Sequence, residues 1–576
     1  MSRESMCVMN TDRVSLVIVS DFTVTNLAAA FEHLPGLPSV NVTAAPFGQP
    51  TQVLLDDESV VWSGERDAAL IWVRPEAVSS AISAVQAGSA VDRELLHAEA
   101  VAFANAVKQA AKRVQYCFVA TLTVPWYQRA PGYAAAQSDG GTARAVALAN
   151  EYLAMELAGI PNLWILDTQR WLERSQAGYD DQLWYLAKVP FAAGVFHAAA
   201  VDVQSVLRGL LGQARKLIIL DLDDTLWGGT VGDVGWENLQ LGGHDAEGEA
   251  LVDFQKGLKA LEKRGIMLGI VSKNDEKIAR EAIQKHPSMI LRETDFVGWR
   301  INWQDKVQNV QELTQELNIG LQSVVFIDDS SAERARVREA LPDVLVPEWP
   351  ENKMLYPRAL MSLGCFEAGV RSAEDVGRTR MYIEERQREE AKTSAASMGD
   401  WLAALQLKVT VEPFARANAQ RTVQLLNKTN QMNLLTRRMS ESELALWATQ
   451  SGHELWVFTV SDRFGSYGLT GIVGFTVEAQ RAEITDFILS CRVMGRQVEE
   501  TMLYVMVERA RRLGAVTATA TYQPTAKNAP CLRFFQQSGW HASGEDGHCF
   551  SWQTADQYAL PSHVDLDLLD GMGGAR

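Results

Sequence analysis

The sequence predicts an α/β protein of three consecutive domains, which 576 residues accommodate at roughly 150 residues per domain. Through about residue 212, short apolar runs alternate with stretches of helical length, and the same alternation begins again at residue 213 and lasts to about 365. Strands that alternate with helices form a parallel sheet covered on both faces, so both regions favour doubly wound, Rossmann-like domains. From about residue 401 several strands precede the next long helix, which favours an α+β domain.

The formal net charge of −17 comes from 54 Lys and Arg against 71 Asp and Glu residues. An acidic chain repels nucleic acid, so we expect no nucleic-acid partner. Apolar runs stop well short of the ~20 residues that span a membrane, and the beginning of the sequence lacks the apolar core of a secretory signal. We therefore expect a cytoplasmic protein without membrane insertion. The six cysteines show no CxxC or Cys/His spacing, which argues against a zinc site or a disulfide framework.

The first domain, residues 1–212, has apolar runs that read as buried strands and longer amphipathic runs that read as helices. The expected strands are 15–20, 69–75, 116–122 and 163–167, and the expected helices are 91–112 and 142–159. After the first strand, "VSDFTVTNL" resembles the element in which SGNH hydrolases carry Gly-Asp-Ser, but Phe22 occupies the serine position. Residues 181–191 offer no Asp-x-x-His pair, so both nucleophile and base are missing. We therefore expect residues 1–212 to form an SGNH- or flavodoxin-like domain that binds a substrate, a carrier or a partner and catalyses no reaction.

The second domain, residues 213–365, has expected strands at 216–220, 266–271, 323–328 and 344–347. The first of them ends in "DLDDT", where Asp221 and Asp223 lie two residues apart. On an extended segment both side chains face the same side. Paired carboxylates at a strand end favour a cation with oxygen ligands, most simply Mg²⁺.

Other polar groups follow the neighbouring strands of this domain. Ser272 and Lys273 follow the second strand, Lys306 precedes a helix, and Asp328 with Asp329 ends the third strand. In open α/β sheets these ends meet in one ligand crevice. A cation, a lysine and a hydroxyl can hold a phosphate there while a carboxylate attacks it.

These four motifs, in this order, resemble the haloacid dehalogenase (HAD) superfamily. The resemblance implies that Asp221 is the nucleophile, which forms an aspartyl-phosphate, and that Asp223 is the general acid/base. It implies a phosphate-binding set of Thr225, Ser272, Lys273 and Lys306. It implies a Mg²⁺ set of Asp221, Asp223 and Asp328. The insert after the first motif is short, so no large cap is expected and the site is open to a carrier-borne substrate.

Residues 366–400 are rich in charge and favour a connecting helix followed by a linker. The third domain, residues 401–557, precedes an expected loose tail at 558–576. Its expected strands are 407–414, 454–462, 470–478, 482–490 and 515–522, and its expected helices are 495–514 and 530–539. The polar runs 424–438 and 461–471 favour either a site wall or ordinary caps and turns.

"SCRVMGRQVEE" joins a strand of the third domain to a helix, whose start exposes N–H groups to an anion. Its Arg-x-x-Gly-x-Gln element resembles the pyrophosphate loop of GNAT acyltransferases, with Gln497 in place of a small residue. The resemblance implies acyl- or pantetheine-binding roles for Arg492, Gly495, Gln497 and Asn528.

Cys491 stands beside this loop, where the helix start and nearby arginines would lower the pKa of its thiol. It is therefore a candidate catalytic nucleophile that accepts an acyl group; the alternative is a small core residue. Cys531 is a second, weaker candidate.

The combined pattern over residues 215–545 resembles the FkbH-like family, whose usual first motif has Asn where Asp224 stands. The resemblance implies a glyceryl transferase/phosphatase that takes a glyceryl unit from 1,3-bisphosphoglycerate. The acceptor would be the phosphopantetheine thiol of an acyl carrier protein, which gains a thioester. Alternatives are a Mg²⁺-dependent phosphatase on a sugar or other small phosphoester in polyketide or surface-polysaccharide biosynthesis, and a carrier-docking scaffold with little activity.

Overall fold

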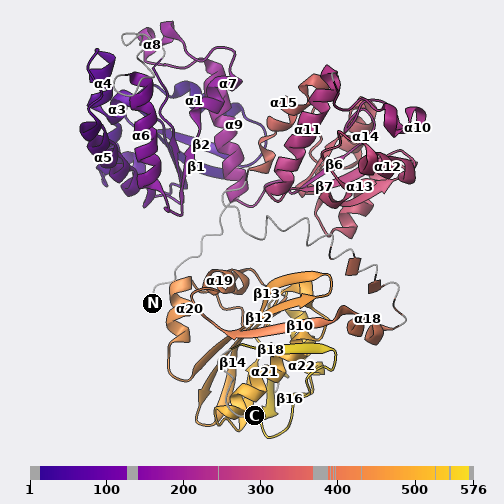
Figure 1. The fold of residues 1–576 in the computed structure, drawn as a ribbon. Helices are drawn as coiled ribbons and strands as arrows, with labels where there is room; N and C mark the ends of the chain where they lie inside the picture. Colours follow the sequence, from indigo (N-terminus) through magenta and orange to yellow (C-terminus); the bar gives the residue numbers. More distant parts are fainter. Residues whose placement is uncertain are drawn as a thin grey trace. The chain divides into compact units, whose positions relative to one another are not determined.

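The computed structural model describes residues 13–125, 141–243, 245–367 and 397–569 without 430, 526, 544 and 545, together with a few positions between 384 and 395. The chain divides into two compact units, residues 1–376 and 377–576. The described residues of the first unit form two sheets, and those of the second unit form one (Figure 1). The linker expected at 366–400 lies largely outside the described residues.

The first sheet has five parallel strands in the order β2-β1-β3-β4-β5. They are β1 (Arg13–Val19), β2 (Ser39–Ala44), β3 (Ala68–Ile71), β4 (Tyr116–Ala120) and β5 (Leu163–Leu166). The order 2-1-3-4-5 is that of flavodoxin-like doubly wound sheets. Of these strands, β2 was not expected, since "SVNVTA" is short and half polar.

Helices cover both faces of this sheet, as the doubly wound prediction requires. The flanking helices include α1 (Thr25–His33) and α9 (Ala193–Leu210), and α5 (Arg93–Ala111) and α6 (Thr142–Leu157). Neighbouring residues of β1 belong to different cores: Val17 packs with α5 and α6, and Ile18 packs with α1 and α9. Side chains alternate across a strand, so an apolar residue at every position is what a strand buried on both faces needs.

The second sheet has four parallel strands in the order β8-β7-β6-β9. They are β6 (Leu217–Leu220), β7 (Met267–Ser272), β8 (Phe296–Ile301) and β9 (Val324–Ile327). The chain runs outward from β6 through β7 to β8, then returns to place β9 on the other side of β6. The carboxyl ends of β6 and β9 therefore flank a topological switch point, where ligands bind in open α/β sheets.

The expected fourth strand of this sheet was wrong. Residues 344–347 form no strand, because Leu345 makes only an isolated bridge to Val325. The fourth strand is instead β8, which was not expected. The helices around the sheet are α11 (Ala246–Lys263), α12 (Glu276–Lys285), α13 (Lys306–Glu316), α14 (Ser331–Ala340) and α15 (Tyr356–Met361). The short insert after β6 contains α10 (Val231–Val234) and a 3₁₀ turn at Trp236–Asn238.

The second unit contains a nine-stranded sheet in the order β16-β17-β15-β14-β13-β12-β10-β18, with β11 also paired to β14. Its strands are β10 (Leu407–Pro413), β11 (Met432–Asn433), β12 (His453–Asp462), β13 (Gly465–Glu478), β14 (Arg481–Leu489), β15 (Thr517–Thr521), β16 (His541–Ser543), β17 (Cys549–Gln553) and β18 (Val564–Leu568). Its helices include α18 (Met398–Leu405), α19 (Ala419–Lys428), α20 (Glu441–Ala448), α21 (Val498–Arg512) and α22 (Ala529–Gln537).

The expectation of a loose tail from residue 558 is wrong for β18, which pairs in parallel with β10.

Within the polar run 461–471, Asp462 makes hydrogen bonds inside this unit. Both carboxylate oxygens of Asp462 accept hydrogen bonds from the buried Arg388, and one also accepts from the hydroxyl of Tyr467.

Across the described part of the chain, the helices are too short or too polar to cross a membrane.

Candidate active site

Three carboxylates gather at the switch point of the second sheet. Asp221 directly follows β6, and Asp328 and Asp329 directly follow β9. One oxygen from each lies within 4.8 Å of one from each of the others. Asp221 and Asp328 are buried, so their charges need compensation.

Lys306 supplies part of that compensation from the first position of α13. Its Nζ lies 2.6 Å from Oδ2 of Asp328 and 3.1 Å from Oδ1 of Asp221. Burial works to lower the pKa of Lys306, but the two carboxylates outweigh it and raise the pKa, so the ammonium stays charged. Burial and the charge of Asp221 raise the pKa of Asp328 to about 6.

The cluster fits a hard divalent cation. Oδ1 of Asp221 is buried and makes the ion pair with Lys306 but no hydrogen bond. One ammonium against three carboxylates leaves an excess of negative charge. Carboxylate oxygens are the ligands that Mg²⁺ takes in proteins, and Asp221, Asp328 and Asp329 would hold it here.

Asp223 lies apart from these three carboxylates, although the sequence placed it in the Mg²⁺ set. Its Oδ1 accepts hydrogen bonds from Nε1 of Trp227 at 2.8 Å and the N–H of Val231 at 3.1 Å. Its Oδ2 accepts from Nδ2 of Asn274 at 2.8 Å. Burial, opposed by the bonds from Val231 and Trp227, raises the pKa of Asp223. The carboxylate of Asp223 is therefore held by the segments that follow β6 and β7, and it lies outside the acid cluster.

Asp224 fixes the turn between the strand and the insert. Its φ of +54° is a left-handed conformation, which Asp tolerates better than most residues. Oδ1 accepts from the N–H of Gly229 at 2.9 Å and from Nζ of Lys353 at 2.6 Å, and the backbone carbonyl accepts from the hydroxyl of Tyr356 at 3.1 Å. No sequence pattern marked Lys353 as a partner of Asp224, because the two residues are 129 positions apart.

The remaining members of the expected phosphate set have different positions. Oγ1 of Thr225 accepts a hydrogen bond from the N–H of Asp329 at 3.2 Å, which ties the first motif to the last. Ser272 is buried at the end of β7. Lys273 instead forms an ion pair with Glu333 of α14 at 2.6 Å, and its side chain is 41% exposed. Consecutive residues at a strand end point to opposite sides, so Ser272 and Lys273 cannot serve the same site equally.

The first sheet offers no serine nucleophile at the matching place. The Phe22 ring packs edge-on against Trp72 and Phe191 and is buried in the core. Beside it, Asp21 accepts hydrogen bonds from the N–H and Nε of Arg74, both at 2.8 Å.

In the second unit Cys491 is exposed at the start of a 3₁₀ turn that follows β14. Cys531 is buried, and burial raises the pKa of its thiol to about 12, so it carries no thiolate at neutral pH. Cys549 on β17 is also exposed, and no motif in the sequence marked it. Accessibility therefore favours Cys491 over Cys531.

The loop beside Cys491 already holds a carboxylate of its own. The N–H of Gly495 donates to Oε1 of Glu499 at 2.9 Å, so this donor is occupied within the fold. Glu499 is buried, and burial raises its pKa to about 7. Gln497 adopts φ +61° just before α21, and Nε of Arg492 donates to Oγ of Ser490 at 3.4 Å.

Asn528 is fully engaged inside the fold. Its Oδ1 accepts from the hydroxyl of Tyr522 and the N–H of Thr525, both at 2.7 Å. Its Nδ2 donates to the carbonyls of Asn433 at 3.0 Å and Gln523 at 2.9 Å. A side-chain amide has two donors and one carbonyl acceptor, so the structure leaves no donor for an acyl or pantetheine group. Asn528 joins β11 to the loop after β15.

Comparisons with known proteins agree best for the first unit. The N-terminal part of the protein BF1531 from Bacteroides fragilis, described as containing a phosphatase domain complexed with Mg, is 26% identical with a TM-score of 0.55. The match covers 62% of this chain and 95% of that one. No protein-family model matches the sequence, and no curated protein does.

Smaller matches are to acetyltransferases. The ribosomal-protein-S18-alanine N-acetyltransferase from Escherichia coli is 10% identical with a TM-score of 0.20, covering 27% of this chain and 97% of that one. The GNAT domain of S. lividans PAT is 17% identical with a TM-score of 0.21, covering 25% and 89%. TM-scores this low support no argument about function, so the function of the second unit has to be inferred from its own residues. The chain is an enzyme, and the acid cluster lies in a HAD phosphatase-like domain.

Proposed function

We propose that the protein is a glyceryl transferase/phosphatase that takes the glyceryl unit of 1,3-bisphosphoglycerate, removes its phosphates and loads it on an acyl carrier protein as a thioester. The observation that carries the phosphatase half is the buried Asp221 beside Lys306, with one carboxylate oxygen free of hydrogen bonds. The transfer half rests on the FkbH-like sequence pattern and on the exposed thiol of Cys491.

In the phosphatase half, a carboxylate oxygen of Asp221 attacks the phosphorus of the C3 phosphate ester. The new O–P bond forms as the ester O–P bond breaks, and Asp223 gives its proton to the departing alcohol oxygen. Water, deprotonated by Asp223, then releases phosphate and regenerates Asp221. Lys306 neutralises charge on the phosphoryl oxygens throughout, and Mg²⁺, when bound, supplies further neutralisation.

In the transfer half, the sulfur of Cys491 attacks the carbonyl of the acyl phosphate, and its proton passes to the departing phosphate. A thioester forms and inorganic phosphate leaves. The phosphopantetheine thiol of the carrier then attacks this thioester, which moves the acyl group to the carrier and regenerates Cys491. Each turnover thus consumes one water and releases two phosphates.

A plain Mg²⁺-dependent phosphatase acting on a sugar or other small phosphoester is the second candidate. It is favoured by the description of the Bacteroides neighbour as a phosphatase domain complexed with Mg. In that case the second unit would bind ligand without transferring an acyl group.

Intact-protein mass spectrometry separates the two. The full chain is mixed with 1,3-bisphosphoglycerate, Mg²⁺ and an acyl carrier protein in its phosphopantetheine form. The transferase proposal expects the mass of one glyceryl group on the carrier, and loss of it with Cys491→Ala. Phosphate release without any adduct on either protein would leave the phosphatase alone, and absence of both would favour a scaffold.

A further inference from the structure

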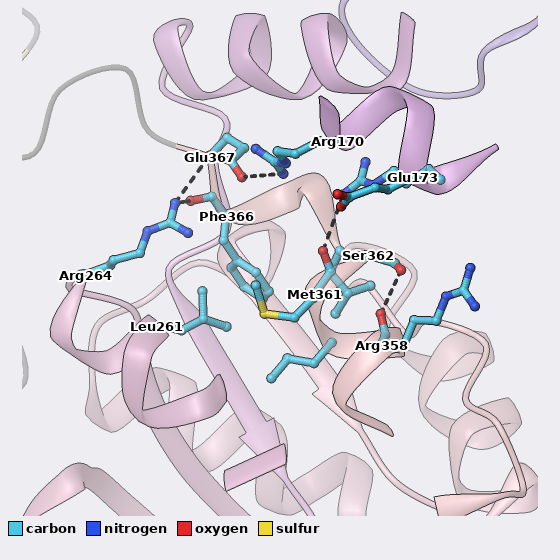
Figure 2. A pocket seen from close by; sticks show the side chains of 12 residues that line it. Arg170, Glu173, Leu261, Arg264, Arg358, Met361, Ser362, Phe366 and Glu367 are labelled. Atoms are coloured by element: carbon cyan, nitrogen blue, oxygen red, sulfur yellow. Dashed lines mark hydrogen bonds and ion pairs between the residues drawn. The ribbon is translucent and has the colours of Figure 1, made fainter. Parts of the chain in front are cut away.

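A cavity of about 580 Å³ lies where the first and second sheets of the first unit meet. Its walls come from both sides: α7 (Thr168–Arg174) follows the first sheet, and the ends of α11 and α15 belong to the second. Figure 2 shows Arg264 and Arg358 on opposite sides of Met361 and Phe366.

This cavity lies near the amino-terminal ends of the strands of the second sheet, whereas the acid cluster lies at their carboxyl ends. Arg264 closes α11 shortly before β7 begins, whereas the catalytic side chains follow the carboxyl ends of their strands. Phe366 lies close to the beginning of β6, since the neighbouring carbonyl of Cys365 accepts from the N–H of Arg215 at 2.8 Å. A ligand here would not compete with substrate for Asp221.

The cavity is positively charged in an otherwise acidic chain. Its titratable lining residues are four arginines and two glutamates, an excess of two positive charges against −17 for the whole chain: Arg170, Arg174, Arg264, Arg358, Glu173 and Glu367. Glu367 lies 3.3 Å from Arg264 and 3.9 Å from Arg170, which holds both guanidinium groups in place. Nη2 of Arg174 donates to the carbonyl of Met361 at 3.4 Å.

Arg358 differs from the other three. Within the described residues its guanidinium has no hydrogen bond or ion pair, although the side chain lines the cavity. The floor between the arginines is apolar, because Leu261, Leu360 and Phe366 are buried there. The site therefore combines held cations, one uncommitted cation and a hydrophobic surface.

We propose that this cavity binds a phosphate monoester with an apolar body. A monoester carries about −1.5 to −2 charges at neutral pH, and the lining residues carry an excess of two positive charges, one of which is shared with Asp202 at 3.7 Å from Arg170. A planar guanidinium group can donate two parallel hydrogen bonds to two oxygens of one phosphate, and the apolar floor would cover the carbon skeleton of the monoester. The cavity is also in the size range of small-molecule sites, roughly 300–1,000 Å³.

Because the walls come from both sheets, a bound ligand bridges them. Binding stabilises only the state in which α7 and the end of α11 face each other, so it raises the unfolding temperature of the first unit. The competing interpretation is an ion-pair junction that holds the two sheets and takes no ligand.

Calorimetric titration of the full chain with phenylphosphonate, a dianion that the phosphatase site cannot hydrolyse, tests the proposal. Four proteins are compared: wild type, Arg358→Gln, Ser272→Ala and the surface control Arg338→Gln. We expect saturable binding to wild type, about tenfold weaker binding to Arg358→Gln, and unchanged binding to Arg338→Gln. Since Ser272 belongs to the phosphatase edge, an unchanged affinity of Ser272→Ala places the probe in the cavity.

Benzenesulfonate, a monoanion with a similar head and ring, provides the charge control and should bind at least several-fold more weakly. The proposal is wrong if wild type shows no saturable binding of phenylphosphonate, or if Arg358→Gln binds it as tightly as wild type. Equal affinity for benzenesulfonate would overturn the choice of a phosphate monoester.

Discussion

The ammonium of Lys306 lies 3.1 Å from Oδ1 of Asp221, and both side chains are almost completely buried. The lysine comes from the start of α13 and the aspartate from the end of β6, so the pair exists only when the sheet is assembled. In a buried site its charge acts on the phosphoryl group with little screening.

Replacing Lys306 by Met should therefore lower phosphate release by a factor of about 10²–10³, as the loss of one charge-stabilising donor does in other active sites. Lys273→Met is the matched control, since Lys273 pairs with Glu333 near the surface. Its rate should stay within about threefold of wild type. Steady-state phosphate release from a generic phosphoester measures both, and a large loss in the Lys273 variant would return that residue to the phosphate-binding set.

Mg²⁺ should stabilise the first unit against unfolding. Asp221, Asp328 and Asp329 repel one another, and a cation that binds only the folded state removes that repulsion. At about 100 times the dissociation constant the gain is about 2.7 kcal/mol, a rise of a few degrees in the unfolding temperature. Differential scanning calorimetry with and without EDTA measures it. Asp329→Asn should lose most of the rise, and an undiminished rise would place the ion elsewhere.

The turn at Asp224 should affect catalysis more than stability. Asp224→Asn keeps an oxygen for the N–H of Gly229 and for Lys353, so its turnover should remain within about threefold of wild type. Asp224→Ala loses both bonds next to Asp223, and we expect turnover to fall at least tenfold. The lost ion pair is partly exposed to solvent and worth under about 1 kcal/mol. Turnover and thermal unfolding are to be measured on both variants. If Asp224→Ala turns over as fast as Asp224→Asn, the turn does not position Asp223.

Glu499 predicts a pH dependence of stability in the second unit. Its pKa is about 7 in the folded state against 4.5 as the ordinary value, so the folded state binds the proton more tightly. This contribution is full below pH 4.5 and is lost as the pH rises to about 7, in total about 3 kcal/mol. Glu499→Gln should match wild type near pH 4.5 and be more stable at pH 8. Denaturant unfolding at both pH values checks the sign, with exposed Glu441→Gln as control.

Thiol accessibility in the second unit predicts which cysteine reacts. Brief iodoacetamide treatment should label the exposed Cys491 and Cys549 and spare Cys531, whose burial raises the pKa of its thiol to about 12. Peptide mass spectrometry identifies the sites. The acyl adduct should persist in Cys531→Ala and Cys549→Ala and vanish in Cys491→Ala. An adduct that survives in Cys491→Ala would remove this residue from the proposed mechanism.

Runs of consecutive apolar residues predicted the central strands well, because a strand buried on both faces needs an apolar residue at every position. Weaker patterns misled: "VLVP" is apolar but makes a single bridge, whereas half-polar β2 pairs fully with β1. The acid cluster was predictable, since its members directly follow strands. Lys353 was not, because its pairing with Asp224 depends on how distant segments pack. Asn528 was assigned to a ligand because its four internal bonds are invisible in the sequence.

The pairing of β18 with β10 has a practical consequence for making shortened versions of the protein. Removing residues from 564 onward would strip β10 of its outer neighbour and expose the edge along which five of its residues, 407–411, pair with β18. Such an open edge recruits strands from other molecules. Versions that stop before β18 should precipitate or self-associate, and affinity tags belong beyond residue 569.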